Sequence, residues 1–167
     1  GILFNHESPR RGETFVTKKI IKALVRIKMG YQKQLVLGNL DSKRDWGHAR
    51  DYVEAMWKIL QQKKPNDYVI ATGKQHSIRQ FINFVAKKLN MKIIWKGTGL
   101  NEVGYDVLNK KKIILVDKNY IRPLDVNTLL GNAAKARREL KWKPQINIHT
   151  LIDEMITEEM NILSNDQ

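Results

Sequence analysis

The sequence predicts an α/β fold, because short apolar runs typical of strands alternate with stretches whose apolar residues recur at helical spacing. Two of these runs, "GILF" at 1–4 and "YVIATG" at 68–73, are continuously apolar. This is typical of fully buried strands in a parallel sheet covered on both faces. The chain has too few such strands to build that sheet alone, so we expect it to form part of a larger one.

The first half is expected to alternate between strands, loops and two helices. A loop over 5–13 follows the first strand, since Pro9 and Gly12 interrupt any regular element. A helix over 15–29 ends at Gly30, and a short strand at 34–39 leads into a Gly-Asn turn. The clearest helix covers 48–62, and its apolar residues form one stripe. These residues are Ala49, Tyr52, Val53, Met56, Trp57 and Leu60.

The second half continues the alternation. Ser77 and Gln80 have the spacing of a capping box and predict the start of a helix that runs to about Leu89. Strands are expected at 92–95 and 112–116, and the segment 97–111 between them, rich in Gly, Asn and Lys, reads as a mobile loop. A short helix at about 133–140 precedes a final helix at about 150–163, with Thr150 as a possible N-cap.

Composition excludes several kinds of site. The chain has no cysteine, which excludes disulfides, Cys-ligated zinc and thiol nucleophiles. Its four histidines lie far apart, so we expect no metal site. They are His6, His48, His76 and His149. No apolar run approaches the roughly 18 residues of a membrane span, and the N-terminus lacks the order of a signal peptide, so we expect a cytoplasmic protein without a membrane partner.

The net charge of +13 implies an anionic partner: nucleic acid, an acidic surface or a phosphorylated small molecule. The basic residues are nevertheless spread along the chain without a long stripe or tail. Several pairs fall near expected helix C-termini, where the helix dipole favours cations in any case. Much of this charge is therefore interpreted as solvated surface.

Four polar clusters lie where strands or turns end, which is where open α/β sheets bind ligands. They are 5–11, Lys19, 38–44 and "IRPLDV" at 121–126. Arg44 and Arg122 suit bidentate contacts to phosphate, and Lys19 offers a point charge to the same anion. Asp125 could accept from a sugar hydroxyl or from the edge of a guanine.

Simpler interpretations of the same residues stay open. Arg44 and Asp45 could form a local salt bridge, with Trp46 as a core anchor beside them. Arg10 and Arg11 could lie in an exposed turn, and Asp51 could be a solvated charge. The sequence lacks the motifs needed for nicotinamide chemistry. It contains no G-x-G-x-x-G fingerprint, no P-loop and no Tyr-x-x-x-Lys pair.

Five blocks, taken together in their order and spacing, resemble one known family. They are "GILFNHESPRRGETFVT", "LGNLDSKRDWGHARDYVEAMW", "DYVIATG", "YIRPLDV" and "LLGNAAKARRELKWKP". From Gly1 to about Ile162 the chain resembles the C-terminal half of the GDP-mannose 4,6-dehydratases, which are extended short-chain dehydrogenase/reductase enzymes. The resemblance implies the last elements of a Rossmann-type sheet, interleaved with substrate-binding segments over 1–74, and a small α/β C-terminal substrate-binding domain over 75–167.

The resemblance also implies the chemistry of the parent protein. In this family bound NADP takes hydride from the sugar 4-position of GDP-mannose, water is eliminated across the 5- and 6-positions, and hydride returns at the 6-position. The product, GDP-4-keto-6-deoxymannose, leads to GDP-fucose and other deoxyhexoses. The catalytic residues belong to the half that would precede Gly1, so we expect none in this chain and no activity from it alone.

For this chain the resemblance implies a role in binding. Asn5 would contact the nucleotide sugar, while Lys19, Arg44 and Arg122 would form the cradle for its pyrophosphate and nucleotide. Gly38 and Asn39 would line the nucleotide pocket, and Asp125 stands where the family usually has Glu. One loop would reach a neighbouring subunit's NADP phosphate, which implies a homo-oligomer, either a dimer or a tetramer. Its residues are Ser8, Arg10 and Arg11.

Two alternatives come from the same residues. A small basic nucleic-acid-binding module would stack bases on Trp46, Trp95 and Trp142, but it requires basic and aromatic residues interleaved on one surface. The scattered lysines disfavour it, and we expect no nucleic-acid partner. A related epimerase or decarboxylase is disfavoured because "NHESPRRGE" fits the GDP-mannose dehydratases better than their UDP- and dTDP-sugar relatives.

Overall fold

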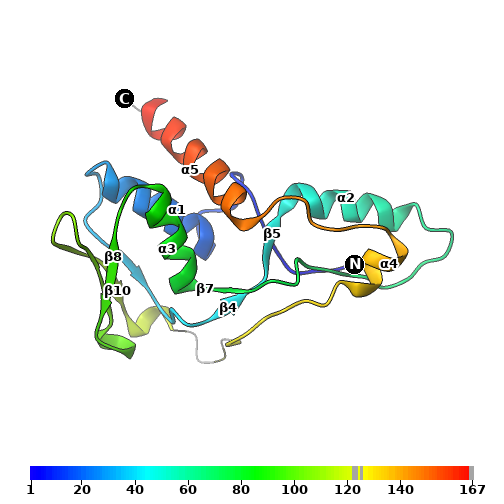
Figure 1. The fold of residues 1–167 in the computed structure, drawn as a ribbon, viewed down its shortest axis with the longest axis horizontal. Coiled ribbons are helices and arrows are strands. Elements are labelled where there is room, and N and C mark those ends of the chain that lie inside the picture. Colours follow the sequence, from blue (N-terminus) through cyan, green and yellow to red (C-terminus); the bar gives the residue numbers. More distant parts are fainter. Residues whose placement is uncertain (122–123, 125, 166–167) are drawn as a thin grey trace.

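The computed structural model describes residues 1–121, 124 and 126–165. Over these residues the chain forms an elongated α/β structure with two lobes (Figure 1). One lobe contains a four-stranded sheet with α1, α3 and α5. The other contains a two-stranded sheet with α2 and α4. The α/β class predicted from the sequence is therefore confirmed.

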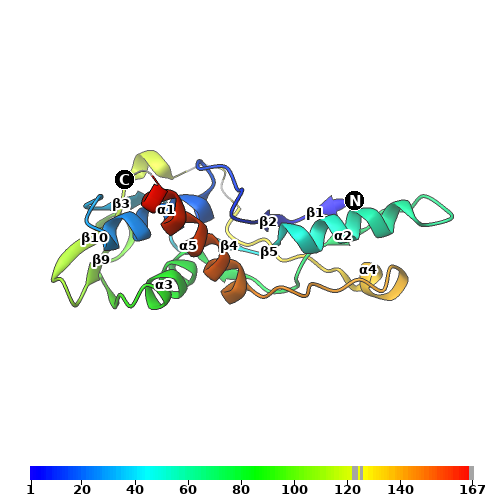
Figure 2. The same ribbon diagram turned by 90° about the horizontal axis from the view of Figure 1, so that it is seen from above.

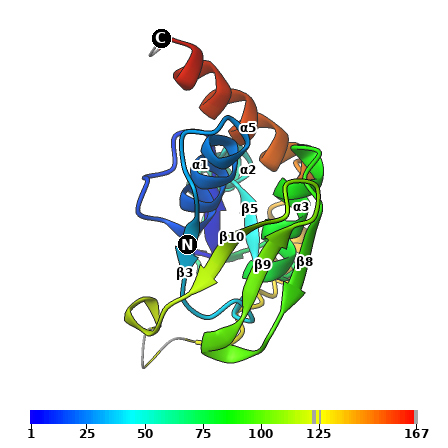
Figure 3. The same cartoon turned by 90° about the vertical axis from the view of Figure 1, so that its left-hand side faces the viewer.

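The four-stranded sheet has the order β3-β10-β9-β8. Strand β3 (Leu35–Leu37) pairs in parallel with β10 (Lys111–Val116), whereas β9 (Val103–Asp106) and β8 (Ile93–Lys96) add antiparallel strands. One face of the sheet is covered by helices, as Figure 3 shows. These helices are α1 (Val16–Lys28) and α3 (Ile78–Lys88), and α5 (Ile148–Asn165) packs against both of them. Their apolar faces and the inner face of the sheet form the larger hydrophobic core.

The second lobe is built around a parallel pair, β1 (Ile2–Leu3) with β6 (Val69–Ile70). Helix α2 (Ala49–Leu60) and the short α4 (Ala134–Glu139) pack against this pair. The resulting cluster includes Tyr52, Ile70 and Trp142, all at most 1% exposed.

Short strands join the two lobes, as the view from above shows (Figure 2). Strand β2 (Asn5–Glu7) pairs in parallel with β5 (Trp46–His48), and β4 (Lys43–Arg44) pairs antiparallel with β7 (His76–Ser77). Two 3₁₀ turns, η1 (Gly99–Asn101) and η2 (Lys118–Tyr120), complete the described elements. The candidate site residues lie mainly on these joining segments and on α1.

Most predicted elements are present with shifted ends. The capping box of α3 is confirmed, since Ser77 and Gln80 exchange both hydrogen bonds. The loop predicted over 97–111 is wrong for 103–106, which form β9 in the interior of the sheet. The loop predicted over 5–13 contains β2. Helix α5 begins at Ile148, two residues before Thr150, and the side chain of Asn147 accepts hydrogen bonds from the backbone N–H groups of His149 and Thr150.

The apolar stripe predicted for α2 is buried only in part. Tyr52 is fully buried, but Val53 and Trp57 are each 60% exposed and Leu60 is 80% exposed. Ile2, in the "GILF" run that is expected to be buried within a larger sheet, is 57% exposed in this chain. The described residues therefore cover one side of this helix and leave an apolar arc open.

Within the described part of the chain, every helix is too short or too polar to span a membrane. The same residues bring no three side chains of His, Asp or Glu together in a group suited to a metal ion.

Candidate functional site

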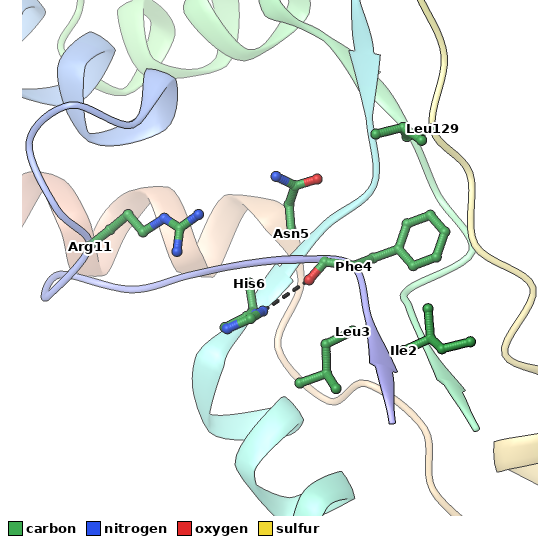
Figure 4. A pocket seen from close by; sticks show the side chains of 7 residues that line it. All are labelled: Ile2, Leu3, Phe4, Asn5, His6, Arg11 and Leu129. Carbon is green, nitrogen blue, oxygen red and sulfur yellow. Dashed lines mark hydrogen bonds between the residues drawn. The ribbon is translucent and has the colours of Figure 1, made fainter. Parts of the chain in front are cut away.

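Asn5 lies beside a cavity of about 330 Å³ where β1 passes into β2 (Figure 4). Its lining is apolar on one side and polar on the other: Ile2, Leu3, Phe4, Asn5, His6, Arg11 and Leu129. The ring of His6 is fixed, because its Nδ1 lies 2.9 Å from the Phe4 carbonyl oxygen and its face stacks on Tyr52. This cavity therefore combines an amide and a guanidinium with an apolar wall.

The loop after β2 holds its two arginines differently. The Nε of Arg11 lies 3.1 Å from Glu7 Oε2, and its guanidinium stacks 3.5 Å above the ring of Phe15. Glu7 is buried and also accepts a 2.6 Å hydrogen bond from Thr17 Oγ1. Burial raises the pKa of Glu7, and the Thr17 hydrogen bond and the charge of Arg11 oppose that rise. Arg10 is exposed, and its backbone N–H donates to Ser8 Oγ.

Lys19 lies on α1 beside a second cavity, also of about 330 Å³. Its ammonium donates a 2.8 Å hydrogen bond to the Val36 carbonyl oxygen and lies 4.0 Å from the centroid of the Tyr120 ring. Burial lowers the pKa of Lys19. The rest of the lining is amphipathic: Glu13, Lys22, Ala23, Arg26, Gln32, Gln34 and Leu35. The cavity thus offers three cations, two amides and an aromatic ring, together with the carboxylate of Glu13, which pairs with Lys22 at 2.6 Å.

Gly38 and Asn39 form the turn that follows β3. The backbone of Gly38 lies directly against the carbonyl of Tyr120, so any β-carbon at position 38 would collide with that carbonyl. Asn39 Oδ1 accepts a hydrogen bond from the Asp41 N–H at 2.9 Å, which stabilises the turn. The lack of a side chain at Gly38 therefore allows Tyr120, which forms one wall of the Lys19 cavity, to lie this close to the turn.

Arg44 connects β4 to Val126, the last residue of "IRPLDV". Its Nη1 donates to the carbonyl oxygens of Val126, at 2.6 Å, and Lys43, at 2.9 Å. Arg122 and Asp125, the other two residues predicted for this site, lie outside the described residues. Asn5 and Arg11 thus line one cavity and Lys19 the other, while Arg44 lies on the joining strands.

Asp45 and Trp46, which follow Arg44 in the sequence, hold the surrounding segments in place. Trp46 is the expected core anchor, since it is 3% exposed and its ring centroid lies 5.1 Å from that of Phe81. Asp45 is fully buried, and its carboxylate accepts from the N–H groups of Thr72, Gly73 and Gly131. The residues next to Arg44 therefore hold three separated segments together.

Two further residues have roles that sequence reasoning missed. The solvated charge expected at Asp51 is wrong, because Asp51 is 3% exposed and its Oδ2 accepts from the N–H groups of Gln145 and Ile146. His48 caps α2 by accepting from the Arg50 N–H at Nδ1, so its Nε2 carries the proton and donates to Glu154 Oε2 at 2.9 Å. The one available signal for His48 was its position just before the apolar stripe. For Asp51 the partner segment is over 90 residues away, and no residue near Asp51 in the sequence indicates it.

Comparison with known proteins now places the chain. The sequence model of a protein family described as "GDP-mannose 4,6 dehydratase" matches residues 1–155. The chain belongs to the GDP-mannose 4,6-dehydratase family. The GDP-mannose 4,6 dehydratase 2 of Caenorhabditis elegans is 49% identical over 99% of this chain and 43% of its own length. The GDP-mannose 4,6 dehydratase of Homo sapiens is 47% identical over 98% of this chain and 44% of its own length. The chain therefore spans less than half the length of these dehydratases.

Solved structures agree on the fold. The structure of RMD from Pseudomonas aeruginosa complexed with NADPH superposes with a TM-score of 0.76 at 21% identity, over 96% of this chain and 47% of that one. The dTDP-glucose 4,6-dehydratase of Bacillus anthracis in complex with NAD gives a TM-score of 0.70 at 16% identity, over 95% of this chain and 43% of that one. The GDP-mannose 4,6-dehydratase family member described here thus has part of an extended short-chain dehydrogenase/reductase fold, as the sequence predicts.

Proposed function

We propose that this chain is the GDP-mannose-binding part of a GDP-mannose 4,6-dehydratase, a lyase that converts GDP-mannose to GDP-4-keto-6-deoxymannose and water. The dehydratase family membership supports the parent activity. The observation that carries the binding role is the Lys19 cavity, where a partly desolvated ammonium lies over an aromatic ring. Lys22, which pairs with Glu13, and Arg26 line the same cavity. A cation shielded from water attracts a diphosphate more strongly than an exposed one does.

In this proposal the Lys19 cavity takes the nucleotide end of the substrate. The ring of Tyr120 provides a face for the base, and Lys19 provides a positive charge for the phosphates. Gly38 and Asn39 form the turn beside them. The guanidinium groups of Arg44 and Arg122 contribute to the pyrophosphate cradle. Asp125 accepts a hydrogen bond from a sugar hydroxyl or from the guanine edge.

Asn5 takes the sugar end, with its amide able to donate to one hydroxyl and accept from another. The loop that carries Ser8, Arg10 and Arg11 reaches the NADP phosphate of a neighbouring subunit in a dimer or tetramer. Within that loop Arg10 suits the phosphate best, because Arg11 already contacts Glu7 and Phe15. Arg11 would act by holding the loop in shape.

NADP, when bound, supplies the acceptor and donor of hydride. This chain lacks the glycine fingerprint and the Tyr-x-x-x-Lys pair, so its own residues bind and orient the sugar nucleotide, and we propose that the chain alone is inactive. We further propose the division into 1–74, the end of the nucleotide-binding domain, and 75–167, the substrate-binding domain. The parent enzyme would act in the cytoplasm, in the biosynthesis of GDP-fucose and other deoxyhexoses.

Calorimetric titration of the purified chain with GDP-mannose, GDP and UDP-glucose tests the binding role. We expect GDP and GDP-mannose to bind more tightly than UDP-glucose. Lys19→Met should weaken GDP binding about tenfold or more, which corresponds to the loss of one charge-assisted contact. Lys63→Met, which removes the same charge from an exposed position on the other lobe, is the matched control.

Equal affinity for all three nucleotides, or an equal effect of both substitutions, would contradict the assignment of this cavity. Incubation with GDP-mannose and NADP tests the second part of the proposal. Turnover by the 167-residue chain would show that the parts for hydride transfer are present after all.

A further inference from the structure

The fold gathers lysines that are scattered in the sequence at one end of the four-stranded sheet (Figures 1 and 3). The Lys92 carbonyl accepts from the N–H of Val107, just beyond β9, and Lys111 pairs with Asp106 across the β9–β10 hairpin. The Gln34 side chain donates to the Lys112 carbonyl, which brings the end of the α1–β3 connection to the same place. The last turns of α1 and α3 point there too. All the lysines of this "lysine end" are exposed: Lys28, Lys33, Lys87, Lys88, Lys92, Lys110, Lys111 and Lys112.

Few acidic groups neutralise this end. Lys88 pairs with Asp153 at 2.7 Å, and the ammonium of Lys112 lies 6.0 Å from the ring of Tyr105. Within the described part of the chain, Lys33, Lys92, Lys110 and Lys111 form no salt bridge. The helix dipole explains cations at the ends of α1 and α3, but these four lysines are outside helices. The proposed nucleotide site does not use them either.

An apolar tip protrudes among the lysines. Residues 107–110 form the turn between β9 and β10, where Leu108 is 66% exposed and Val107 is 37% exposed. Asp106, which is 1% exposed, holds the turn by accepting from the Leu108 N–H at 3.2 Å and from the Asn109 side-chain amide at 2.5 Å. Two aliphatic side chains are therefore presented on a braced turn, surrounded by uncompensated positive charge.

We infer that the lysine end and the Val107–Leu108 tip together bind the surface of an anionic lipid bilayer. Lysine ammonium groups suit dispersed lipid phosphates, because they act as point charges without a required bidentate geometry. The aliphatic tip can enter the boundary between headgroups and acyl chains, which polar tips cannot do. This inference is independent of the proposed function, since it assigns no role to the proposed ligand-binding residues. It departs from the expectation of no membrane partner, which was drawn from the lack of an apolar span, because binding to a bilayer surface needs no such span.

Single-stranded nucleic acid fits the same surface less well. Such partners need open aromatic faces on which bases stack. Tyr105, in β9, already has Lys96 at 5.2 Å and Lys112 at 6.0 Å from its ring centroid. Tyr31, beside Lys33, is 55% exposed but adds a single ring where successive bases need several. The exposed apolar groups at the tip itself are aliphatic.

Co-sedimentation of the chain with phosphatidylcholine vesicles, with and without phosphatidylglycerol, tests this inference. We expect binding to the anionic vesicles, and a loss of about 100-fold in the partition coefficient when Lys110→Gln, Lys111→Gln and Lys112→Gln are combined. The matched control is Lys63→Gln, Lys64→Gln and Lys143→Gln, an equal charge change at exposed positions outside the lysine end. It should change the partition coefficient by less than about fivefold, since distant charges are screened.

Leu108→Ser separates the apolar contribution from net charge. It should lower binding about tenfold, and Val53→Ser, at an exposed aliphatic position on α2, should leave binding unchanged. Absence of binding by the unaltered chain, or equal losses for the two lysine triples, would overturn the inference. Tighter binding of a short single-stranded RNA that depends on the hairpin lysines but not on Leu108 would overturn it in favour of a nucleic-acid surface.

Discussion

Replacing Asp45 by alanine should destabilise the chain by about 3–5 kcal/mol, because one buried carboxylate joins three segments far apart in the sequence. Its oxygens accept from the N–H groups of Thr72 and Gly73, each at 2.9 Å, and of Gly131, at 3.3 Å. Asp45 also accepts from the Thr72 hydroxyl at 2.6 Å. That hydroxyl has a second acceptor in the Lys74 carbonyl, so its loss adds little.

The magnitude follows from the three backbone donors. A buried N–H that loses its acceptor costs roughly 1–3 kcal/mol, which gives roughly 3–9 kcal/mol for three. The bonds from Thr72 and Gly73 are only partly buried, so water replaces part of what is lost and the cost lies near the lower end of the range, at about 3–5 kcal/mol. Asp45→Asn preserves shape but turns one acceptor into a donor facing an N–H, and should cost about 2 kcal/mol.

Urea unfolding followed by far-UV circular dichroism measures this effect, with trimethylamine N-oxide at a fixed concentration to favour the compact state. Asp117→Ala is the matched control. Among the described residues its carboxylate accepts only from the Asn119 N–H, at an exposed turn, so the loss should be about 1 kcal/mol or less. If Asp45→Ala costs no more than Asp117→Ala, the account of Asp45 as a connector of three separated segments is refuted.

Two further predictions concern the Lys19 cavity. Because burial lowers the pKa of Lys19, affinity for GDP should fall as the pH rises through that lowered pKa. Lys19→Arg should remove this pH dependence, since arginine stays charged. GDP titrations over a series of pH values measure the effect, and a flat profile for the unaltered chain would contradict it. Gly38→Ala should weaken GDP binding about tenfold or more, because the new β-carbon collides with the Tyr120 carbonyl and displaces one wall of the cavity. Gly12→Ala is its control, since a β-carbon there meets only the Phe15 ring at an ordinary 3.4 Å, and equal affinities for both variants would exclude the proposed role of Tyr120.

The fold could be predicted from sequence where local chemistry decides it. The capping box of Ser77 and Gln80 and the apolar periodicity of α1 and α3 act within one helix, so the sequence alone reports them. Strand β9 could not be found this way. It is four residues long and contains Gly104, whose place in the sheet is favourable because Ile114 and Trp95 pack closely over it. That packing is a long-range property, and composition suggested a loop instead.

The candidate site divides in the same manner. Residue type and the resemblance to the dehydratase family predict that Lys19 and Arg44 bind an anion. The contacts that position them come from segments distant in sequence: Val36 and Tyr120 for Lys19, and Val126 for Arg44. Residue type reports what a side chain can bind, whereas its partners depend on the packing of the whole chain.

The open apolar arc of α2 has a related physical origin. Helical periodicity shows which residues of a helix form its apolar stripe. It does not show which of them pack against the core of this chain and which are left exposed. Tyr52 and Ala55 face the lobe's own core, whereas Val53, Trp57 and Leu60 face away from it. The adjacent sheet has only two short parallel strands, an arrangement that is marginal without further strands and a second covering layer. The relatives named above are more than twice as long as this chain, so a family-length polypeptide contains further residues that such an arc could face.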